Sequence, residues 1–231
     1  MSLPIYWLDD DPTLFPHPDQ ALSDPNGLLA AGGDLSVERL LNAYSLGIFP
    51  WFNEGEPILW WSPSPRCVIK PSEFKPSKSL AKLIRKDKYT VTFDQNFESV
   101  MVNCAQARSE GTWISEDMIE AYCQLNLKGY AHSVECRLNG ELVGGLYGIA
   151  LGGVFFGESM YSSQSNTSKV AFAFLCSKLS QWGFTLIDCQ VHSDHLESLG
   201  AYEISKQAFH DQLKSGLNKK TEAQWYHDEN R

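Results

Sequence analysis

The order of helix and strand patterns after residue 66 constrains the fold of this chain more than any other feature. Apolar residues at helical spacing predict helices at 77–86, 96–108, 115–127 and 167–182. Runs rich in β-branched and aromatic residues predict strands at 89–94, 132–138, 141–151, 154–161 and 185–191. Asn139-Gly140 is a favoured two-residue hairpin turn between the second and third of these strands. With short helices predicted at 194–199 and 205–214, this part of the chain is predicted to be a mixed α/β unit.

The first 65 residues have a different composition. They are rich in glycine and aromatic residues and contain seven prolines before residue 60. One helix is predicted at 37–44, with Ser36 as its N-cap and Gly47 as its stop signal. Pro63 and Pro65 mark a boundary. We therefore predict an N-terminal domain at 1–65 and a second domain at 66–231, with a polar, loose tail after about residue 215.

The second domain resembles a known fold in its element order. Strand, two helices, three strands, helix, strand and helix is the order of the GNAT acyltransferase fold. The predicted fold class is therefore α+β, with a small N-terminal α/β domain packed on a GNAT-like acyltransferase domain. Acyl-CoA users of this fold carry a glycine-rich turn whose backbone amides hold pyrophosphate. The corresponding loop at 162–167 contains no glycine, which argues against coenzyme A.

The strand predicted at 185–191 carries two polar side chains in an otherwise apolar run. Asp188 and Gln190 are two positions apart, so a regular strand places both on one face. A buried carboxylate is costly unless it is hydrogen-bonded. Because a carboxylate can polarise a neighbouring amide, this pair suggests proton handling at a reacting amine or carbonyl. Glu158 ends another apolar strand, and both a shared cleft with Asp188 and simple solvent exposure fit its position.

The charge of the chain is unevenly distributed. The formal net charge is −9, which argues against general nucleic-acid affinity. Residues 66–88 nevertheless contain eight lysines and arginines against two acidic residues. Both a solvated helix face and a phosphate-binding patch fit this block. The seven members that we consider for tRNA binding are Arg66, Lys70, Lys75, Lys78, Lys82, Arg85 and Lys86.

The spacing of the cysteines and the shortness of the apolar runs predict a cytoplasmic protein, and no metal site is predicted. The six cysteines form no C-x-x-C pair, which is typical of reduced thiols. Cys189, His192 and His195 are spaced by three, but a strand-to-helix transition makes their convergence on one zinc ion a poor prediction. The N-terminus lacks the features of a signal peptide, and no apolar run approaches the ~20 residues that span a membrane.

Several short segments, taken together and in order, resemble one family, the leucyl/phenylalanyl-tRNA–protein transferases. The resemblance runs from about residue 15 to about residue 210. It includes Trp60-Trp61-Ser62-Pro63, Thr112-Trp113-Ile114 and Asp188-Cys189-Gln190. The other matching segments are 26–35, 47–51, 65–66, 129–135, 142–148, 156–160, 195–196 and 198–201. Ser45, Ser163 and Lys206 stand where this family has arginine. We expect the loss of two arginines, at Ser45 and Ser163, to weaken phosphate contacts.

The resemblance implies a reaction and its partners. Such an enzyme takes Leu, Phe or Met from its tRNA and attaches it to a protein whose N-terminal residue is Arg or Lys. The product enters N-end-rule degradation. Because an ester becoming an amide is downhill, no cofactor or metal is expected. We also expect a monomer that does not bind membranes.

The resemblance also implies roles for particular residues. Asp188, Gln190 and Glu158 are the expected catalytic group, in which Asp188 orients and polarises Gln190 and the Gln190 carbonyl oxygen accepts a hydrogen bond from the attacking amine. Glu158 is expected at the acceptor's basic residue or at the reacting centre. Trp51 and Trp113 are expected to hold the 3′-terminal adenosine. The expected pocket for the aminoacyl side chain consists of Leu146, Phe155, Gly157, Phe172, Leu175 and Ile187.

Two other classes of function remain open at this stage. The first is a GNAT-fold N-acetyltransferase that uses an acyl-CoA, which the loop at 162–167 disfavours. The second is a tRNA-binding module without catalysis, which leaves the pairing of Asp188 and Gln190 unexplained.

Overall fold

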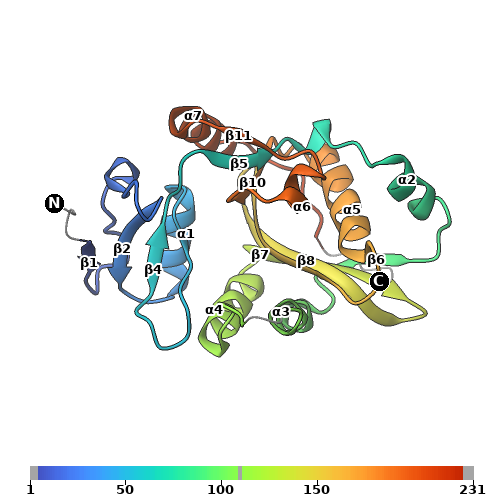
Figure 1. Cartoon of the computed structure of the whole chain (residues 1–231), viewed down its shortest axis with the longest axis horizontal. Coiled ribbons are helices and arrows are strands. Elements are labelled where there is room, and N and C mark those ends of the chain that lie inside the picture. Colours follow the sequence, from blue (N-terminus) through green and yellow to red (C-terminus); the bar gives the residue numbers. More distant parts are fainter. Residues whose placement is uncertain (1–4, 109–110, 226–231) are drawn as a thin grey trace.

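The computed structural model describes residues 5–108 and 111–225 and contains two β-sheets (Figure 1). The first sheet has four strands in the order β1-β2-β4-β3. Its strands are β1 (Tyr6–Leu8), β2 (Leu28–Gly32), β3 (Phe49–Pro50) and β4 (Leu59–Trp61). Between β2 and β3 lies helix α1 (Val37–Ser45), whose first turn is capped by the Ser36 hydroxyl accepting the backbone N–H of Arg39. A 3₁₀ turn, η1 (Pro18–Gln20), precedes β2.

The second sheet has seven strands in the order β11-β5-β10-β9-β8-β7-β6. Its strands are β5 (Arg66–Ile69), β6 (Thr90–Phe93), β7 (Ala131–Leu138), β8 (Glu141–Leu151), β9 (Val154–Ser162), β10 (Leu186–Gln190) and β11 (Tyr202–Ile204). β9 and β10 run parallel from Leu186 opposite Val154 to Asp188 opposite Phe156, whereas the other described pairs in this sheet are antiparallel. The three residues predicted to be catalytic, Glu158 on β9 and Asp188 and Gln190 on β10, lie toward the end of this parallel pair.

Helices cover both faces of the second sheet (Figure 1). Helices α3 and α4 pack on one face, and α5 packs on the other with α2 beside it. Each face has its own buried apolar cluster. The helices are α2 (Lys78–Ile84), α3 (Phe97–Gln106), α4 (Glu116–Leu127), α5 (Thr167–Gln181), α6 (Asp194–Glu197) and α7 (Lys206–Leu217), with a 3₁₀ turn η2 (Pro71–Glu73). No helix in the two described ranges has the length and apolar character needed to cross a bilayer.

The predicted element order is confirmed from β6 to α6, and the fold class is α+β as predicted. The hairpin turn also matches, because Asn139 and Gly140 both adopt positive φ, as a type I′ turn requires. The loose tail is wrong for the described part of the C-terminus. Helix α7 continues to Leu217, and Trp225 is buried in an aromatic cluster with His132, Phe155 and Trp182. Residues 226–231 lie outside the described residues.

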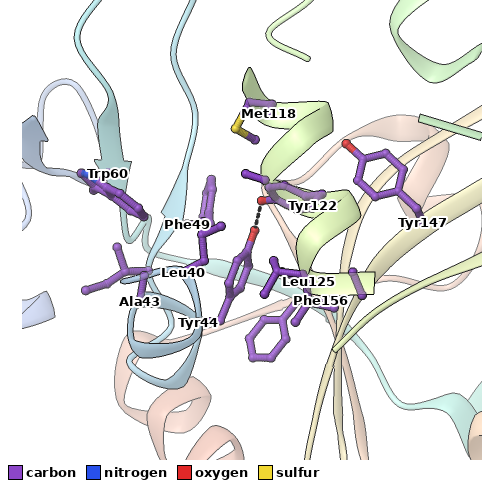
Figure 2. Close-up of a cluster of buried hydrophobic side chains, with 14 of the residues drawn as sticks. Leu40, Ala43, Tyr44, Phe49, Trp60, Met118, Tyr122, Leu125, Tyr147 and Phe156 are labelled. Carbon is purple, nitrogen blue, oxygen red and sulfur yellow. Dashed lines mark hydrogen bonds between the residues drawn. The ribbon is translucent and has the colours of Figure 1, made fainter. Parts of the chain in front are cut away.

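The two sheets share one buried cluster at their contact (Figure 2). Tyr44 of α1 reaches across to the second sheet, where its ring packs edge-on against Phe156 and its hydroxyl meets that of Tyr122. The first sheet ends at Trp61 and the second begins at Arg66. We treat the two parts as two domains, and the division at residue 65 remains our proposal.

Candidate active site

A small apolar cavity opens between β8, β9, β10 and helix α5. All six residues predicted for an aminoacyl side-chain pocket line it: Leu146, Phe155, Gly157, Phe172, Leu175 and Ile187. Its volume is about 230 Å³. Ligand pockets for larger molecules are typically about 300–1,000 Å³. The cavity is therefore suited to one apolar side chain rather than to a whole cofactor.

A second, more open hollow adjoins this cavity, and we name it the tryptophan cleft. Trp51 and Trp113 line it, together with Phe49, Pro50 and Val191. The residues that line both the apolar cavity and the tryptophan cleft are Arg108, Glu158, Cys189, Gln190 and Ser193. These five define the junction of the two hollows. A molecule with an apolar end and an aromatic end can thus span them with its middle at the junction.

Glu158 is held at the junction by three hydrogen-bond donors. Its Oε1 accepts the Tyr44 hydroxyl at 2.8 Å and the Gln190 Nε2 at 2.8 Å, and its Oε2 accepts the Tyr122 hydroxyl at 3.2 Å. Its side chain is buried, with a residue exposure of 9%. Burial raises the pKa of Glu158 to about 7, although the hydrogen bonds from the two tyrosines oppose that rise. The carboxyl group therefore changes its charge near neutral pH.

The two tyrosines come from different parts of the chain. Tyr44 lies on α1 beside the first sheet and Tyr122 lies on α4, and their hydroxyls meet where the two parts are packed together (Figure 2). Both tyrosines therefore reach Glu158 only in the packed arrangement. Burial and the neighbouring Glu158 raise the pKa of both hydroxyls well above its usual value, so both remain protonated donors. The sequence does not single out Tyr44 and Tyr122 as site residues, because a tyrosine on the apolar face of a helix is usually an ordinary core residue.

Gln190 sits at an irregular end of β10. The pairing of β10 with β5 shifts its register between Asp188 and Gln190, and Gln190 adopts a positive φ of 64°. This left-handed conformation is uncommon for a residue other than glycine and marks a constrained backbone. Because the Glu158 carboxylate accepts from Nε2, the Gln190 carbonyl oxygen is directed away from Glu158.

Asp188 contacts Gln190 differently from the sequence prediction. Its Oδ1 accepts the backbone N–H of Gln190 at 2.9 Å, not the side-chain amide. The carboxylate that contacts the Gln190 amide is Glu158 instead. Asp188 is fully buried and forms two further hydrogen bonds with Arg66, at 2.8 Å to Nε and 2.7 Å to Nη2. Asp188 therefore holds the backbone of Gln190, and Glu158 holds the side chain of Gln190.

Arg66 does not belong to the basic surface patch for which it was predicted. It is 1% exposed, and its guanidinium lies over the rings of Phe49 at 4.9 Å and Phe209 at 4.5 Å.

The other predicted members of the patch have exposed or partly exposed side chains. Lys70 pairs with Glu73 at 3.1 Å. Lys78 and Lys82 of α2 and Arg85, its C-cap residue, are exposed at spacings of four and three, so they share one side of that helix.

The three residues weighed as zinc ligands do not converge. His192 lies near Glu197, and His195 Nε2 lies 3.2 Å from Met160 Sδ. Cys189 instead lines the junction. Within residues 5–108 and 111–225, no group of three His, Cys, Asp or Glu side chains is arranged to hold a metal ion.

Comparison with known proteins identifies the family. Residues 68–214 match the family described as leucyl/phenylalanyl-tRNA protein transferase, and residues 33–64 match its N-terminal domain. The chain belongs to this family. It is 55% identical over 223 residues to a protein of that name from Pseudomonas putida (strain W619), covering 96% of this chain and 99% of the relative. A relative of the same name from Nitrosospira multiformis is 57% identical over 216 residues, covering 93% of each chain. The family is one of aminoacyltransferases, so the chain is an enzyme of that class.

Solved structures give only distant similarities. A GCN5-related N-acetyltransferase from Kribbella flavida has a TM-score of 0.41 at 12% identity, covering 71% of this chain and 60% of that protein. The L-PGS structure from Bacillus licheniformis has a TM-score of 0.40 at 12% identity, covering 74% of this chain and 56% of that protein. Similarities this weak support no conclusion about substrate.

Proposed function

We propose that this enzyme transfers Leu, Phe or Met from aminoacyl-tRNA to proteins whose N-terminal residue is Arg or Lys, and that the products enter N-end-rule degradation. It would act in the cytoplasm as a monomer. The observation that carries this proposal is the junction, where an apolar cavity for one side chain meets a cleft with two tryptophans. An aminoacyl ester of adenosine has matching chemistry, because its apolar side chain and its base are linked by the reacting ester.

In this arrangement, the aminoacyl side chain fills the apolar cavity. Phe155 and Phe172 supply aromatic walls, and Leu146, Leu175 and Ile187 supply aliphatic ones. Apolar pockets discriminate by only about 1–3 kcal/mol per methylene. Leu, Phe and Met would therefore all be accepted, whereas charged side chains would be excluded by the cost of their desolvation.

The terminal adenosine would occupy the tryptophan cleft. Trp51 is 45% exposed, so much of its side chain is available for stacking on a base. The acceptor stem would then contact the exposed side of α2, where Lys78, Lys82 and Arg85 offer positive charge to phosphates. This local charge would act despite the net charge of −9.

Catalysis would depend on the orientation of Gln190. Its carbonyl oxygen is directed away from Glu158 and would accept a hydrogen bond from the α-amine of the acceptor. An α-amine has a pKa of about 7.7–8.0, so a neutral, nucleophilic fraction exists near pH 7. Glu158 is occupied by three donors and 9% exposed, which supports a role at the reacting centre rather than in binding a long basic side chain.

The proposal is tested by single-turnover transfer. Radiolabelled Phe-tRNA is mixed with excess enzyme and a peptide beginning with Arg, and a matched peptide beginning with Ala is the control. The expected result is a peptide bond to the Arg peptide only. Labelled acetyl-CoA with the same peptide tests the GNAT acetyltransferase alternative. Acetyl transfer without Phe transfer would refute the proposed function, and retention of tRNA without either product would indicate a binding module.

A further inference from the structure

Arg108 occupies a position that neither the sequence nor the family assignment explains. It follows α3 and lines both the apolar cavity and the tryptophan cleft. Among the described residues that line these two hollows, it is the only lysine or arginine. A cation at the junction would stabilise negative charge that develops there.

Two contacts define the position of the Arg108 side chain. Its Nη2 donates a hydrogen bond to the Ser159 hydroxyl at 3.2 Å, and Ser159 lines the apolar cavity. Its guanidinium carbon lies 5.7 Å from the centre of the Trp113 ring, which lines the tryptophan cleft. The guanidinium therefore lies between a β9 residue next to Glu158 and one of the two tryptophans.

We propose that Arg108 is a catalytic residue that donates a hydrogen bond to the carbonyl oxygen of the aminoacyl ester. This inference rests on the proposed function, because it requires an ester that crosses from one hollow to the other. With the side chain in the apolar cavity and the adenosine in the cleft, the ester carbonyl lies at the junction. Five N–H groups in a rigid planar fork allow Arg108 to keep Ser159 as a partner and also donate to this oxygen.

The reaction step balances without another reagent. The acceptor amine nitrogen attacks the ester carbon and forms the C–N bond, and the carbonyl electron pair moves onto oxygen, where Arg108 stabilises the negative charge. The C–O bond to the ribose 3′ oxygen then breaks as the carbonyl re-forms. The proton that the amine loses ends on that 3′ oxygen, giving an amide and a tRNA with a free hydroxyl.

The surroundings of Arg108 favour an ester over a phosphate as its partner. A phosphate contact accounts for a cation beside the cleft, but not for one that also lines a cavity with walls of Leu146, Phe155 and Ile187. The positive charge has a second effect at this point. It disfavours the ammonium form of a nearby amine and so increases the neutral fraction that can attack.

The test compares Arg108→Met, which removes the charge at similar length, with Arg108→Lys, which keeps it. Arg137→Met is the matched control, because Arg137 bonds the backbone of the hairpin turn at Gly140 and lines neither hollow. Two quantities are measured with Phe-tRNA and an Arg-initiated peptide: the single-turnover rate constant at saturation and the Kd for Phe-tRNA. Circular dichroism and thermal unfolding check that each variant is folded.

Arg108→Met should lower the saturated rate about 10²–10³-fold, the usual effect of losing one oxyanion donor, and change the Kd less than about threefold. Arg108→Lys should recover part of the rate, and Arg137→Met should match the wild type. A weaker Kd with an unchanged saturated rate would identify a phosphate contact and overturn the inference, as would no effect on either quantity. Absence of transfer by the wild type would instead count against the proposed function.

A binding measurement tests the inference without turnover. The probe is an adenosine whose 3′ position carries a phenylalanine-derived phosphonate, which copies the tetrahedral oxyanion. The wild type should bind it at least about tenfold more tightly than the neutral 3′-amide analogue. Arg108→Met should abolish that preference, and a preference that survives the substitution would overturn the inference.

Discussion

Arg66 and Asp188 form a bidentate ion pair in which Nε and Nη2 of the arginine lie 2.8 and 2.7 Å from the two carboxylate oxygens. Neither side chain is exposed by more than 1%. The same carboxylate accepts the backbone N–H of Gln190. Both oxygens of Asp188 are already occupied by protein donors. In the function that we propose, Asp188 is therefore a positioning residue and Gln190 is the residue that faces the substrate.

This relationship predicts a large loss of stability when one partner is removed. Arg66→Met leaves the Asp188 carboxylate buried without its cation, which typically costs about 3–5 kcal/mol. The free energy of unfolding from urea titration measures this loss. The double variant Arg66→Met/Asp188→Leu should be more stable than Arg66→Met alone, because no buried charge remains. If Arg66→Met unfolds within 1 kcal/mol of the wild type, this account of the pair is wrong.

The sequence predicted the elements of the second sheet well but not the geometry of the site. Alternating patterns and the Asn139-Gly140 turn are local signals, so the strands and helices from β6 to α6 could be placed. The register shift at Gln190 is a property of the pairing between β10 and β5, which are more than 100 residues apart in sequence. The local pattern predicts a regular strand, so it does not predict that Asp188 bonds the backbone of Gln190 while Glu158 bonds its side chain.

Long-range contacts account for the other differences from the prediction. The sequence places Arg66 among basic neighbours, but sequence shows charge and not burial, and the side chain is buried. Tyr44 and Tyr122 are 78 residues apart, and only the packing of the two sheets brings both to Glu158. The apolar pocket was predicted through the family resemblance, and its six residues do line one cavity.

Gln190→Asn separates the backbone role of this position from its side-chain role. Asparagine tolerates a positive φ better than glutamine, so the turn and its bond to Asp188 should persist. The shorter side chain cannot both reach Glu158 and present its carbonyl oxygen at the same point. We expect a free energy of unfolding within about 0.5 kcal/mol of the wild type and a saturated transfer rate at least tenfold lower. A variant that transfers at the wild-type rate would show that the Gln190 amide does not contact the amine.

The raised pKa of Glu158 predicts that the stability of the protein depends on pH. Its pKa rises from 4.5 to about 7 on folding, so the folded state holds the proton more tightly. The stabilisation this gives is fully present below pH 4.5 and is lost as the pH rises through 7. Between these limits the wild type should lose about 3 kcal/mol relative to Glu158→Gln, which does not titrate. Urea titrations of both proteins from pH 4.5 to 8.5 measure the difference, and a constant difference across that range would contradict the shift.

The raised pKa of Glu158 also predicts that the transfer rate depends on pH. In the proposed mechanism, the Glu158 carboxylate above pH 7 fixes the Gln190 amide with its carbonyl oxygen toward the substrate, so the rate should rise through this pH. Ionisation of the acceptor amine contributes to the same profile in every variant. The ratio of wild-type to Glu158→Gln rates isolates the contribution of Glu158, and it should have its midpoint near pH 7. A ratio independent of pH would exclude this role.

The exposed side of α2 predicts salt-sensitive binding of tRNA. Neutralising Lys78, Lys82 and Arg85 together should weaken the affinity at low salt and reduce the slope of log K against log salt by about two to three. The control neutralises Lys128, Lys214 and Lys220, which are exposed elsewhere on the surface and change the net charge equally. Fluorescence anisotropy at several salt concentrations measures both slopes. Equal slopes for the two triple variants would mean that only net charge matters.

Trp225 connects the C-terminal segment to the wall of the apolar cavity. Its ring stacks on His132 at 3.9 Å and lies 6.0 Å from the ring of Phe155, which lines the cavity. Trp225→Ala should lower the free energy of unfolding by about 3–5 kcal/mol, as for other buried aromatic residues. Trp225→Phe should retain most of the free energy of unfolding of the wild type. Trp7→Ala is the control, because Trp7 is 66% exposed.

The same contact predicts a change in substrate preference. With Trp225→Phe the protein stays folded, but Phe155 has less support and can move away from the cavity. The rate with Phe-tRNA should then change by a different factor from the rate with Leu-tRNA, because the larger ring depends more on the position of that wall. Phe93→Leu also loses a contact with Trp225 but lines neither hollow, so it should lower stability while the Phe-to-Leu ratio stays at its wild-type value. If both variants shift the ratio equally, general loosening of the core explains the effect and Trp225 has no specific role in the pocket.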